Sequence, residues 1–260
     1  VNWSYQSLSI FTIFPLLGWV LVFAGLVILN EIGRRTKIGG IEWVRLLYCY
    51  PEEITEELVQ TIKTEKKICH YLDLPIQHCN DDILKRMGRK TTQADLREKI
   101  SMLRKEIPDI ALRTTLISGF PGETNENHEE CVDFVANMKF ERLGVFPYSP
   151  EEGTPAAGYD RQLPEEIKQE WADEIMQTEQ NVIFAQNEEM IGRRLSVIVD
   201  GYLPEDGVYV GRTYRDAPEI DGCLFFEAPY EIISGTILPV LVTDANGYDL
   251  IGEILPEEDD

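Results

Sequence analysis

The sequence predicts an α/β domain with a parallel sheet, followed by a small all-β barrel. Over residues 41–162, four short apolar runs alternate with stretches that place apolar residues on one helical face. After residue 188 come five β-rich runs separated by glycines, which is the pattern of a small closed barrel. Between them, Pro164 opens an amphipathic stretch, residues 163–187, that we expect to be a connecting helix.

The four apolar runs are the expected strands of the sheet. They cover residues 43–49, 70–76, 110–118 and 143–148. Helices are expected between them, because Asn80, Thr92 and Thr124 each precede an amphipathic stretch and can cap its first turn. A parallel sheet gathers its chemistry at the C-terminal ends of its strands. The candidate site therefore lies in the residues after three of these strands: 77–78, 119–124 and 148–154.

The segment ISGFPGET, residues 117–124, is the most informative of these loops. Gly119 and Gly122 would let a ligand approach the backbone closely, and the N–H groups of the next helix could bind a carboxylate or a ribose hydroxyl. Tight packing explains such glycines equally well. Gln77 and His78 either point into the site or form a hydrogen-bonded buried pair.

Arg113 interrupts an otherwise apolar strand. An arginine in the interior of a strand needs an anionic partner or a path to solvent. A ligand that carries a carboxylate is one such partner, and a neighbouring glutamate is the other.

The expected barrel consists of five short antiparallel strands. They cover residues 195–200, 208–214, 222–227, 236–242 and 248–254. From residue 188 to 260 the sequence has 4 basic and 17 acidic residues, a formal charge of −13, and the whole chain carries −22. Such a domain repels nucleic-acid phosphate and attracts a basic protein, although acidity can also serve solubility alone. We therefore expect a basic protein partner and no nucleic-acid binding by the barrel.

An uncharged run of 22 residues, 8–29, is long enough to span a bilayer, and basic residues follow it. Three interpretations compete for residues 1–40: a membrane anchor, an uncleaved targeting segment, or sequence foreign to the rest of the chain. If the run is an anchor, the positive residues after it predict that the remainder lies in the cytoplasm.

The five cysteines are typical of buried thiols in a reducing compartment. Their number is odd, their gaps are long and unequal, and no C-x-x-C or zinc-type spacing occurs. No metal ligand is therefore assigned to any of them: Cys49, Cys69, Cys79, Cys131 and Cys223.

Four segments occur in order and together resemble the radical-SAM methylthiotransferases. They are RLLYCYPEEI, YLDLPIQHCNDDILKRMGR, RTTLISGFPGET and FPYSPEEGTPA, and the resemblance runs from about residue 41 to about residue 254. It implies a partial (β/α) radical-SAM barrel at 41–162 and a TRAM domain, a five-stranded OB-like barrel, at 188–260. The implied activity attaches a methylthio group to tRNA or a ribosomal protein through a 5′-deoxyadenosyl radical. Its implied cofactors are S-adenosylmethionine and two 4Fe–4S clusters.

The resemblance also implies roles for individual residues, without assigning a catalytic one. Contacts with S-adenosylmethionine are implied for Gln77, Arg113, Gly119, Phe120, Gly122, Glu123 and Tyr148. Contacts with the substrate are implied for Arg89, Arg212, Tyr214 and Asp216.

The segment VGRTYRDAPEIDG, residues 210–222, is similar to the branch of the family that modifies ribosomal protein S12 on the β-carbon of an aspartate. The acidic barrel agrees with a basic ribosomal protein as the substrate. Two other classes stay open: a tRNA methylthiotransferase, and a non-catalytic module that only docks the substrate. We expect a cytoplasmic monomer, which is membrane-anchored only if residues 8–29 are a true span.

The sequence departs from the family at the cluster ligands. The family carries C-x-x-x-C-x-x-C at the start of its barrel and three further cysteines in an N-terminal domain, and the 260 residues contain neither set. The apolar run occupies the place expected for the first set. We therefore expect that this chain alone does not build either cluster.

Overall fold

The computed structural model describes residues 34–255. These residues form two compact units, which divide between Glu179 and Gln180, inside helix α6 (Glu165–Glu188). The predicted domain boundaries around the connecting helix stay predictions. The uncharged run at residues 8–29 lies outside the described residues. Among the helices described, none combines the length and the apolar character needed to cross a bilayer.

A four-stranded parallel sheet forms the centre of the first unit, with its strands in chain order. They are β1 (Val44–Leu46), β2 (Ile68–Asp73), β3 (Ala111–Ser118) and β4 (Arg142–Pro147). All four predicted strands are confirmed, but β1 and β2 end earlier than expected. Tyr48 takes a left-handed φ of 59° after β1. Pro75 follows β2 closely and cannot donate a hydrogen bond to a sheet ladder.

Among the residues that the structure describes, four helices and the first part of α6 belong to this unit. The four are α2 (Glu56–Thr64), α3 (Asp81–Arg86), α4 (Gln93–Glu106) and α5 (Asn125–Met138), with short 3₁₀ turns at Pro51–Glu53 and Pro155–Gly158. The three predicted caps are confirmed. The Asn80 side chain accepts hydrogen bonds from the first turn of α3, and Thr92 and Thr124 each form a capping box, the first with Asp95.

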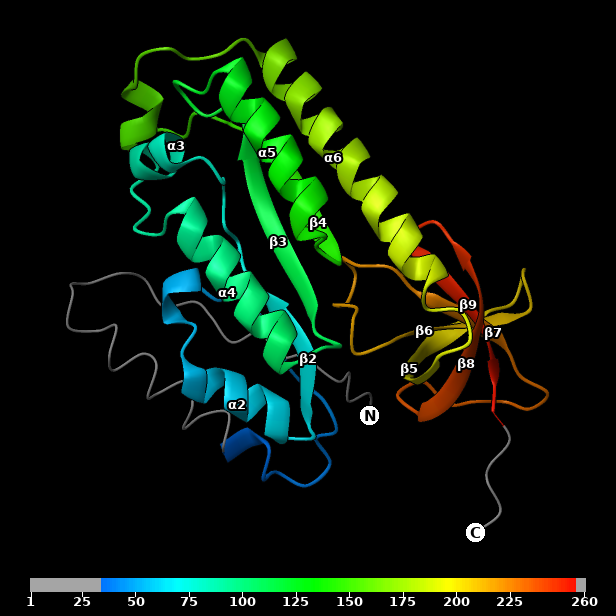
Figure 1. The fold of residues 1–260 in the computed structure, drawn as a ribbon. Helices are drawn as coiled ribbons and strands as arrows, with labels where there is room; N and C mark the ends of the chain where they lie inside the picture. Colours follow the sequence, from blue (N-terminus) through cyan, green and yellow to red (C-terminus); the bar gives the residue numbers. More distant parts are fainter. Residues whose placement is uncertain (1–33, 256–260) are drawn as a thin grey trace. The chain divides into compact units, whose positions relative to one another are not determined.

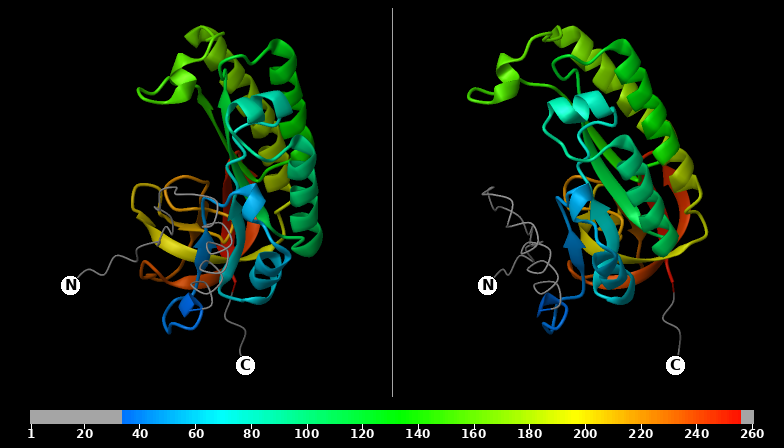
Figure 2. Two further views of the ribbon diagram at one scale, coloured as in Figure 1. Left: turned by 90° about the vertical axis from the view of Figure 1, so that its left-hand side faces the viewer. Right: turned by 60° about the vertical axis from the view of Figure 1, so that its left-hand side comes forward.

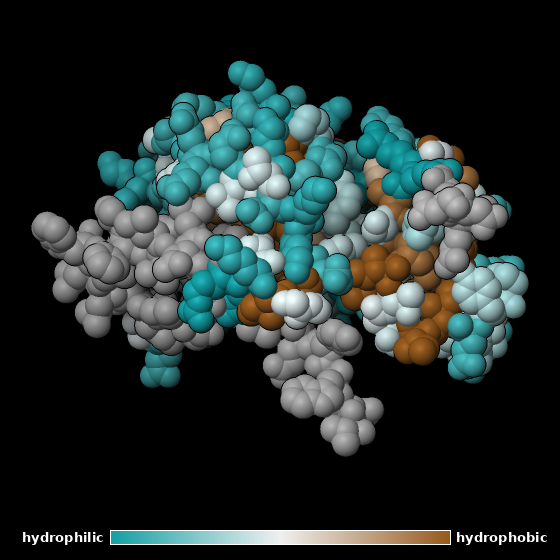
Figure 3. Space-filling model, turned by 90° about the horizontal axis from the view of Figure 1, so that it is seen from below, coloured by the Kyte–Doolittle hydropathy of each residue, from teal (hydrophilic) through white to brown (hydrophobic). Residues whose placement is uncertain are grey.

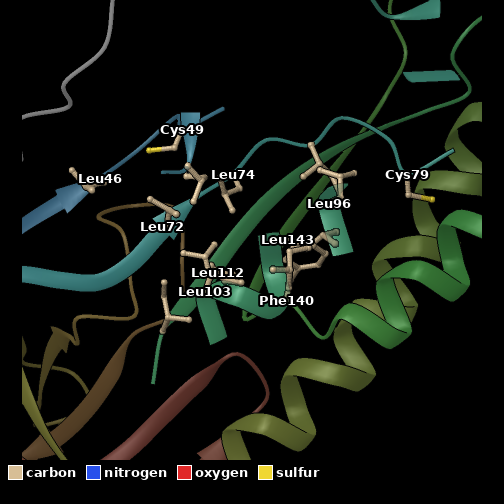
Figure 4. Close-up of a cluster of buried hydrophobic side chains, with 14 of the residues drawn as sticks. Leu46, Cys49, Leu72, Leu74, Cys79, Leu96, Leu103, Leu112, Phe140 and Leu143 are labelled. Carbon is tan, nitrogen blue, oxygen red and sulfur yellow. The ribbon is translucent and has the colours of Figure 1, made fainter. Parts of the chain in front are cut away.

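The helices cover one face of the sheet and bury its leucines (Figures 1 and 2). Leu72, Leu112 and Leu143, from three adjacent strands, meet Leu96 and Leu103 of α4 in a single core (Figure 4). Each leucine buried in this way contributes roughly 1.5–3 kcal/mol. The core therefore holds the strands in register and presents their C-terminal ends along one edge.

The second unit is a closed barrel of five strands after α6. They are β5 (Arg194–Leu203), β6 (Val208–Arg212), β7 (Leu224–Glu227), β8 (Ile237–Asn246) and β9 (Asp249–Ile254). The order around the barrel is β5-β6-β7-β9-β8. The expectation of a wholly antiparallel barrel is wrong for one pair, because β7 and β9 run parallel. β8 and β9 form an antiparallel hairpin, and closing the barrel places β8 beside β5 and β9 beside β7.

Two glycines allow the barrel strands to approach closely. A Cβ on Gly252 would lie 2.5 Å from Val240 Cγ1, and one on Gly211 would lie 2.5 Å from Val197 Cγ1. Both valine side chains are fully buried in the barrel core. Any larger residue at either glycine would therefore displace the core.

Candidate functional site at the C-terminal edge of the sheet

The loops after β2, β3 and β4 are joined by backbone hydrogen bonds at one edge of the sheet. Gln77 donates to Thr115 O and accepts from Ile117 N, and Tyr148 N donates to Ser118 O. Gln77 takes a left-handed φ of 70°, which a residue other than glycine rarely adopts. The structure thus brings together three predicted regions of the site, 77–78, 119–124 and Tyr148.

The glycines of the ISGFPGET segment are required by packing within the unit. Gly119 has a φ of 71°, and a Cβ there would collide with the side chain of Lys168 on α6. Gly122 has a φ of 90°, and its Cβ would lie 3.0 Å from Arg86 Nε. Arg86 Nε also donates to Pro121 O at 2.9 Å. The packing interpretation of these glycines is therefore supported, and contact with a cofactor stays a prediction.

Glu123 and His78 form a buried pair beneath this loop. Glu123 Oε2 accepts a hydrogen bond from Phe120 N at 2.9 Å, and Glu123 Oε1 lies 3.1 Å from His78 Nε2. His78 Nδ1 accepts a hydrogen bond from Asn80 N at 3.0 Å, and Nε2 is the ring nitrogen that lies beside the carboxylate. The Glu123 carboxylate therefore joins the loop after β3 to the loop after β2.

Tyr148 packs beside the same loop, at the end of β4. Its ring meets Phe120 edge to face at 5.1 Å, and Lys168 Nζ donates to Tyr148 O at 2.9 Å. Burial raises the pKa of the Tyr148 phenol, and the nearby Glu151 carboxylate raises it further. The phenol is therefore a neutral group at physiological pH.

Arg113 lies on the sheet face opposite the helices. Alternate residues of β3 pack into the helix-side core, which leaves Arg113 and Ile117 on the other face. Arg113 Nη1 forms an ion pair with Asp73 Oδ1 at 2.9 Å, and Phe146, paired with Ile117, is exposed. Arg113 is thus paired with a neighbouring carboxylate, which was one of its two predicted partners. The carboxylate belongs to an aspartate, whereas a glutamate was expected.

The predicted substrate residues have partners within their own units. Arg89 Nη2 donates to Pro75 O at 2.6 Å, close to the edge described above. In the barrel, Arg212 forms two hydrogen bonds with Asp200, at 2.6 and 2.7 Å. Asp216 accepts from both the backbone and the hydroxyl of Thr213. Tyr214 packs against the barrel core. Their contacts with a substrate stay predictions.

One group of residues went unnoticed in the sequence. His78, Cys79 and Cys131 are all buried, and their ligand atoms lie within 4.8 Å of one another. The hydrogen bond with Cys79, together with burial, raises the pKa of the Cys131 thiol well above its ordinary value. The long gap between Cys79 and Cys131 gave no signal, because only the packing of α5 brings them together.

This group does not fit an iron–sulfur cluster of the radical-SAM type. Such a cluster is held by three thiolates in the C-x-x-x-C-x-x-C pattern, whereas this group offers two thiols and an imidazole in the apolar core. Over residues 34–255, no other group of this kind brings histidine, cysteine and acidic side chains together. The buried His78, Cys79 and Cys131 therefore do not take the place of the missing cluster ligands.

Comparison with known proteins agrees with the fold and with the sequence segments. A Radical SAM superfamily model matches residues 9–135, and a TRAM domain model matches residues 191–255. A protein of Lachnoclostridium phytofermentans named ribosomal protein uS12 methylthiotransferase RimO is 56% identical over 215 residues, which is 83% of this chain and 49% of that protein. Proteins of the same name from Desulfitobacterium hafniense and Geobacter sulfurreducens are 46% and 50% identical, over 88% and 84% of this chain and 50% and 49% of theirs.

This chain belongs to the radical-SAM methylthiotransferase family. It spans about half the length of the curated relatives that it matches. Membership in the family implies S-adenosylmethionine and an iron–sulfur cluster as cofactors.

Solved structures are less similar to this chain than the curated relatives are. Coproporphyrinogen III oxidase from Escherichia coli has a TM-score of 0.46 and 18% identity over 65% of this chain and 39% of that chain. Elp3 from Methanocaldococcus infernus has a TM-score of 0.42 and 16% identity, over 53% of this chain and 32% of that chain. Similarities this low carry no weight in the assignment.

Proposed function

We propose that this chain is part of an enzyme that adds a methylthio group to the β-carbon of an aspartate in ribosomal protein uS12. The observation that supports this most directly is the 46–56% identity with three proteins named uS12 methylthiotransferase. The formal charge of −13 over residues 188–260 gives independent support, because an acidic barrel attracts a basic ribosomal protein. It also disfavours tRNA, whose phosphates it would repel.

In this proposal, S-adenosylmethionine binds at the C-terminal edge of the sheet. Gln77, Gly119 and Tyr148 lie there together, and Arg113 adds a cationic side chain on the face opposite the helices. When bound, the cofactor supplies the radical and the methyl group. The role of the chain is to hold the edge rigid: Glu123 anchors the loop from below, and the neutral Tyr148 phenol adds no charge to the site.

We further propose that the protein acts as a cytoplasmic monomer, with two clusters supplied by the complete enzyme. A uS12 substrate places the reaction where ribosomes are assembled. The monomer is checked by light scattering of the purified chain, in which a mass of twice 29.8 kDa would contradict it.

A chimaera tests the activity without asking this chain to build a cluster alone. Residues 41–260 replace the matching half of the Desulfitobacterium hafniense relative, which keeps its own N-terminal half. The chimaera is reconstituted anaerobically and incubated with S-adenosylmethionine, a reductant and uS12. We expect a methylthiolated aspartate in the mass spectrum of uS12, and none when a cluster-binding cysteine of the relative is replaced by alanine.

The proposal fails if the chimaera folds and shows cluster absorbance, yet leaves uS12 unmodified. Modification of tRNA in the same assay would favour the tRNA class of the family. Unmodified uS12 that still binds the chain tightly would favour a docking module without catalysis.

A further inference from the structure

The barrel carries an open groove lined by aromatic residues. Its volume is about 450 Å³, within the range of roughly 300–1,000 Å³ that ligand pockets occupy. It lies where the hairpin of β5 and β6 meets the segment after β7. The lining residues are Tyr202, Tyr209, Ala228, Pro229, Tyr230, Glu231 and Ile232.

Tyr209 forms the rigid base of this groove. Its ring is stacked on Phe226 at 5.6 Å, and its hydroxyl donates to Tyr230 O at 3.3 Å and accepts from Ile232 N at 3.1 Å. The Tyr209 ring also lies 4.8 Å from that of Tyr202, its partner across the hairpin. One buried tyrosine thus fixes both walls, which makes the groove a preformed feature of the barrel.

The walls leave aromatic surface accessible to a partner. Tyr202 is 49% exposed and Tyr230 is 57% exposed, although large aromatic side chains usually bury most of their area. Next to them, Ile233 is 78% exposed. Figure 3 shows hydrophobic residues gathered on the surface of the barrel unit. Exposed apolar and aromatic surface of this kind marks an interaction site.

The charge around the groove is acidic. Glu231 belongs to the lining, and Glu205 and Asp206 lie in the turn that joins β5 to β6, three and four residues after Tyr202. The four basic residues of the barrel, Arg193, Arg194, Arg212 and Arg215, are all absent from the lining. Tyrosine faces next to carboxylates attract a cation through the ring quadrupole and through Coulomb attraction, and they repel a phosphate.

We propose that this groove binds an arginine or lysine side chain of a basic polypeptide. The side chain lies over the exposed rings of Tyr202 and Tyr230, and its charged end faces Glu231. This inference rests on the proposed function in one respect: the basic polypeptide that it docks in the complete enzyme is uS12.

Binding to a defined probe tests the groove separately from the activity. The full chain is titrated with a fluorescent arginine–glycine repeat peptide at physiological salt, and with the same peptide in which citrulline replaces each arginine. Citrulline keeps the shape of arginine and removes its charge. We expect the arginine peptide to bind and the citrulline peptide to bind at least tenfold more weakly.

Matched variants then locate the binding. Tyr230→Ala removes an exposed ring and leaves the backbone oxygen that Tyr209 uses, and we expect it to weaken binding about two- to fivefold. Glu231→Gln removes one negative charge inside the groove and should weaken binding by a similar factor. Glu253→Gln removes the same charge from an exposed position on β9, outside the lining, and should leave binding unchanged. Circular dichroism checks that each variant is folded, and Glu231→Gln keeps the test valid if Tyr230→Ala is not.

The outcomes separate the groove from the activity. If Glu231→Gln and Glu253→Gln weaken the peptide equally, only net charge matters and the groove inference is wrong. The groove inference is also wrong if chimaeras that carry Tyr230→Ala or Glu231→Gln bind and modify uS12 to the same extent as the unaltered chimaera. If the groove variants weaken the peptide but no chimaera modifies uS12, the groove inference stands and the proposed activity fails. Groove-dependent binding of poly(U) RNA would overturn the choice of a cationic ligand.

Discussion

Removal of the Glu123 carboxylate should destabilise the α/β unit more than removal of any exposed acidic side chain. Glu123 is 5% exposed, and His78, its neighbour at 3.1 Å, is 1% exposed. Glu123→Ala removes the acceptor of the Phe120 N–H, and it takes away the carboxylate that now lies 3.1 Å from His78 Nε2. Each buried polar group left without its neighbour costs about 1–3 kcal/mol, so the two groups together account for about 2–6 kcal/mol.

We therefore expect Glu123→Ala to lower the free energy of unfolding by about 2–6 kcal/mol. Glu123→Gln keeps the volume and one acceptor oxygen, and should cost about 1–3 kcal/mol. Glu129→Ala is the matched control, because it removes the same charge from an exposed position on α5. We expect it to change the free energy of unfolding by no more than about 0.5 kcal/mol. With a urea slope of about 2 kcal/mol/M, a loss of about 4 kcal/mol moves the midpoint by about 2 M.

Tryptophan emission during urea titration reports on this unit through Trp171. Trp171 is buried in α6, where its ring is stacked on His128, and residues 180–260 contain no tryptophan. The expected order of midpoints is Glu129→Ala, then Glu123→Gln, then Glu123→Ala as the lowest. The reasoning is refuted if Glu123→Ala unfolds within about 0.5 kcal/mol of the Glu129→Ala control.

Three further predictions concern a cap, an ion pair and a thiol. Thr92→Ala should cost about 1 kcal/mol at neutral pH by urea unfolding. The hydrogen bond from the Thr92 hydroxyl holds the pKa of the Asp95 carboxyl below its ordinary value of 3.8. The stabilisation from this bond is therefore lost as the pH falls through the lowered pKa. Thr92→Ala should accordingly lose less stability on acidification than the unaltered protein does. Arg113→Ala should cost about 3–5 kcal/mol, because Asp73 is left buried without its cation, and adding Asp73→Ala should recover part of the loss in a double-mutant cycle. Ellman's reagent should label Cys223, the one cysteine that is not buried, before the other four thiols, which should react only in urea; early labelling of a second thiol would contradict the described core.

Local patterns in the sequence were sufficient for the elements. Thr92 and Asp95 lie three residues apart, so their capping box is determined within one turn and could be predicted without knowledge of the fold. The alternation of apolar runs with amphipathic stretches predicted the sheet, and glycine spacing predicted five barrel strands. The family segments placed Gln77, Gly119 and Tyr148 in one site, and the structure brings these residues to one edge.

Contacts between distant residues depended on the tertiary structure. Arg113 indicated the need for an anion, but the choice between a ligand and Asp73, 40 residues earlier, follows from the parallel register of β2 and β3. Lys168 fills the space beside Gly119 only because α6 packs there. Periodicity encodes which face of an element is buried, whereas the identity of the facing side chain is set by how the elements pack. The sequence by itself therefore determined the elements, the family and the acidic charge of the barrel, and the tertiary structure decided the partners of Glu123 and Arg113, the parallel pairing of β7 with β9 and the shape of the tyrosine groove.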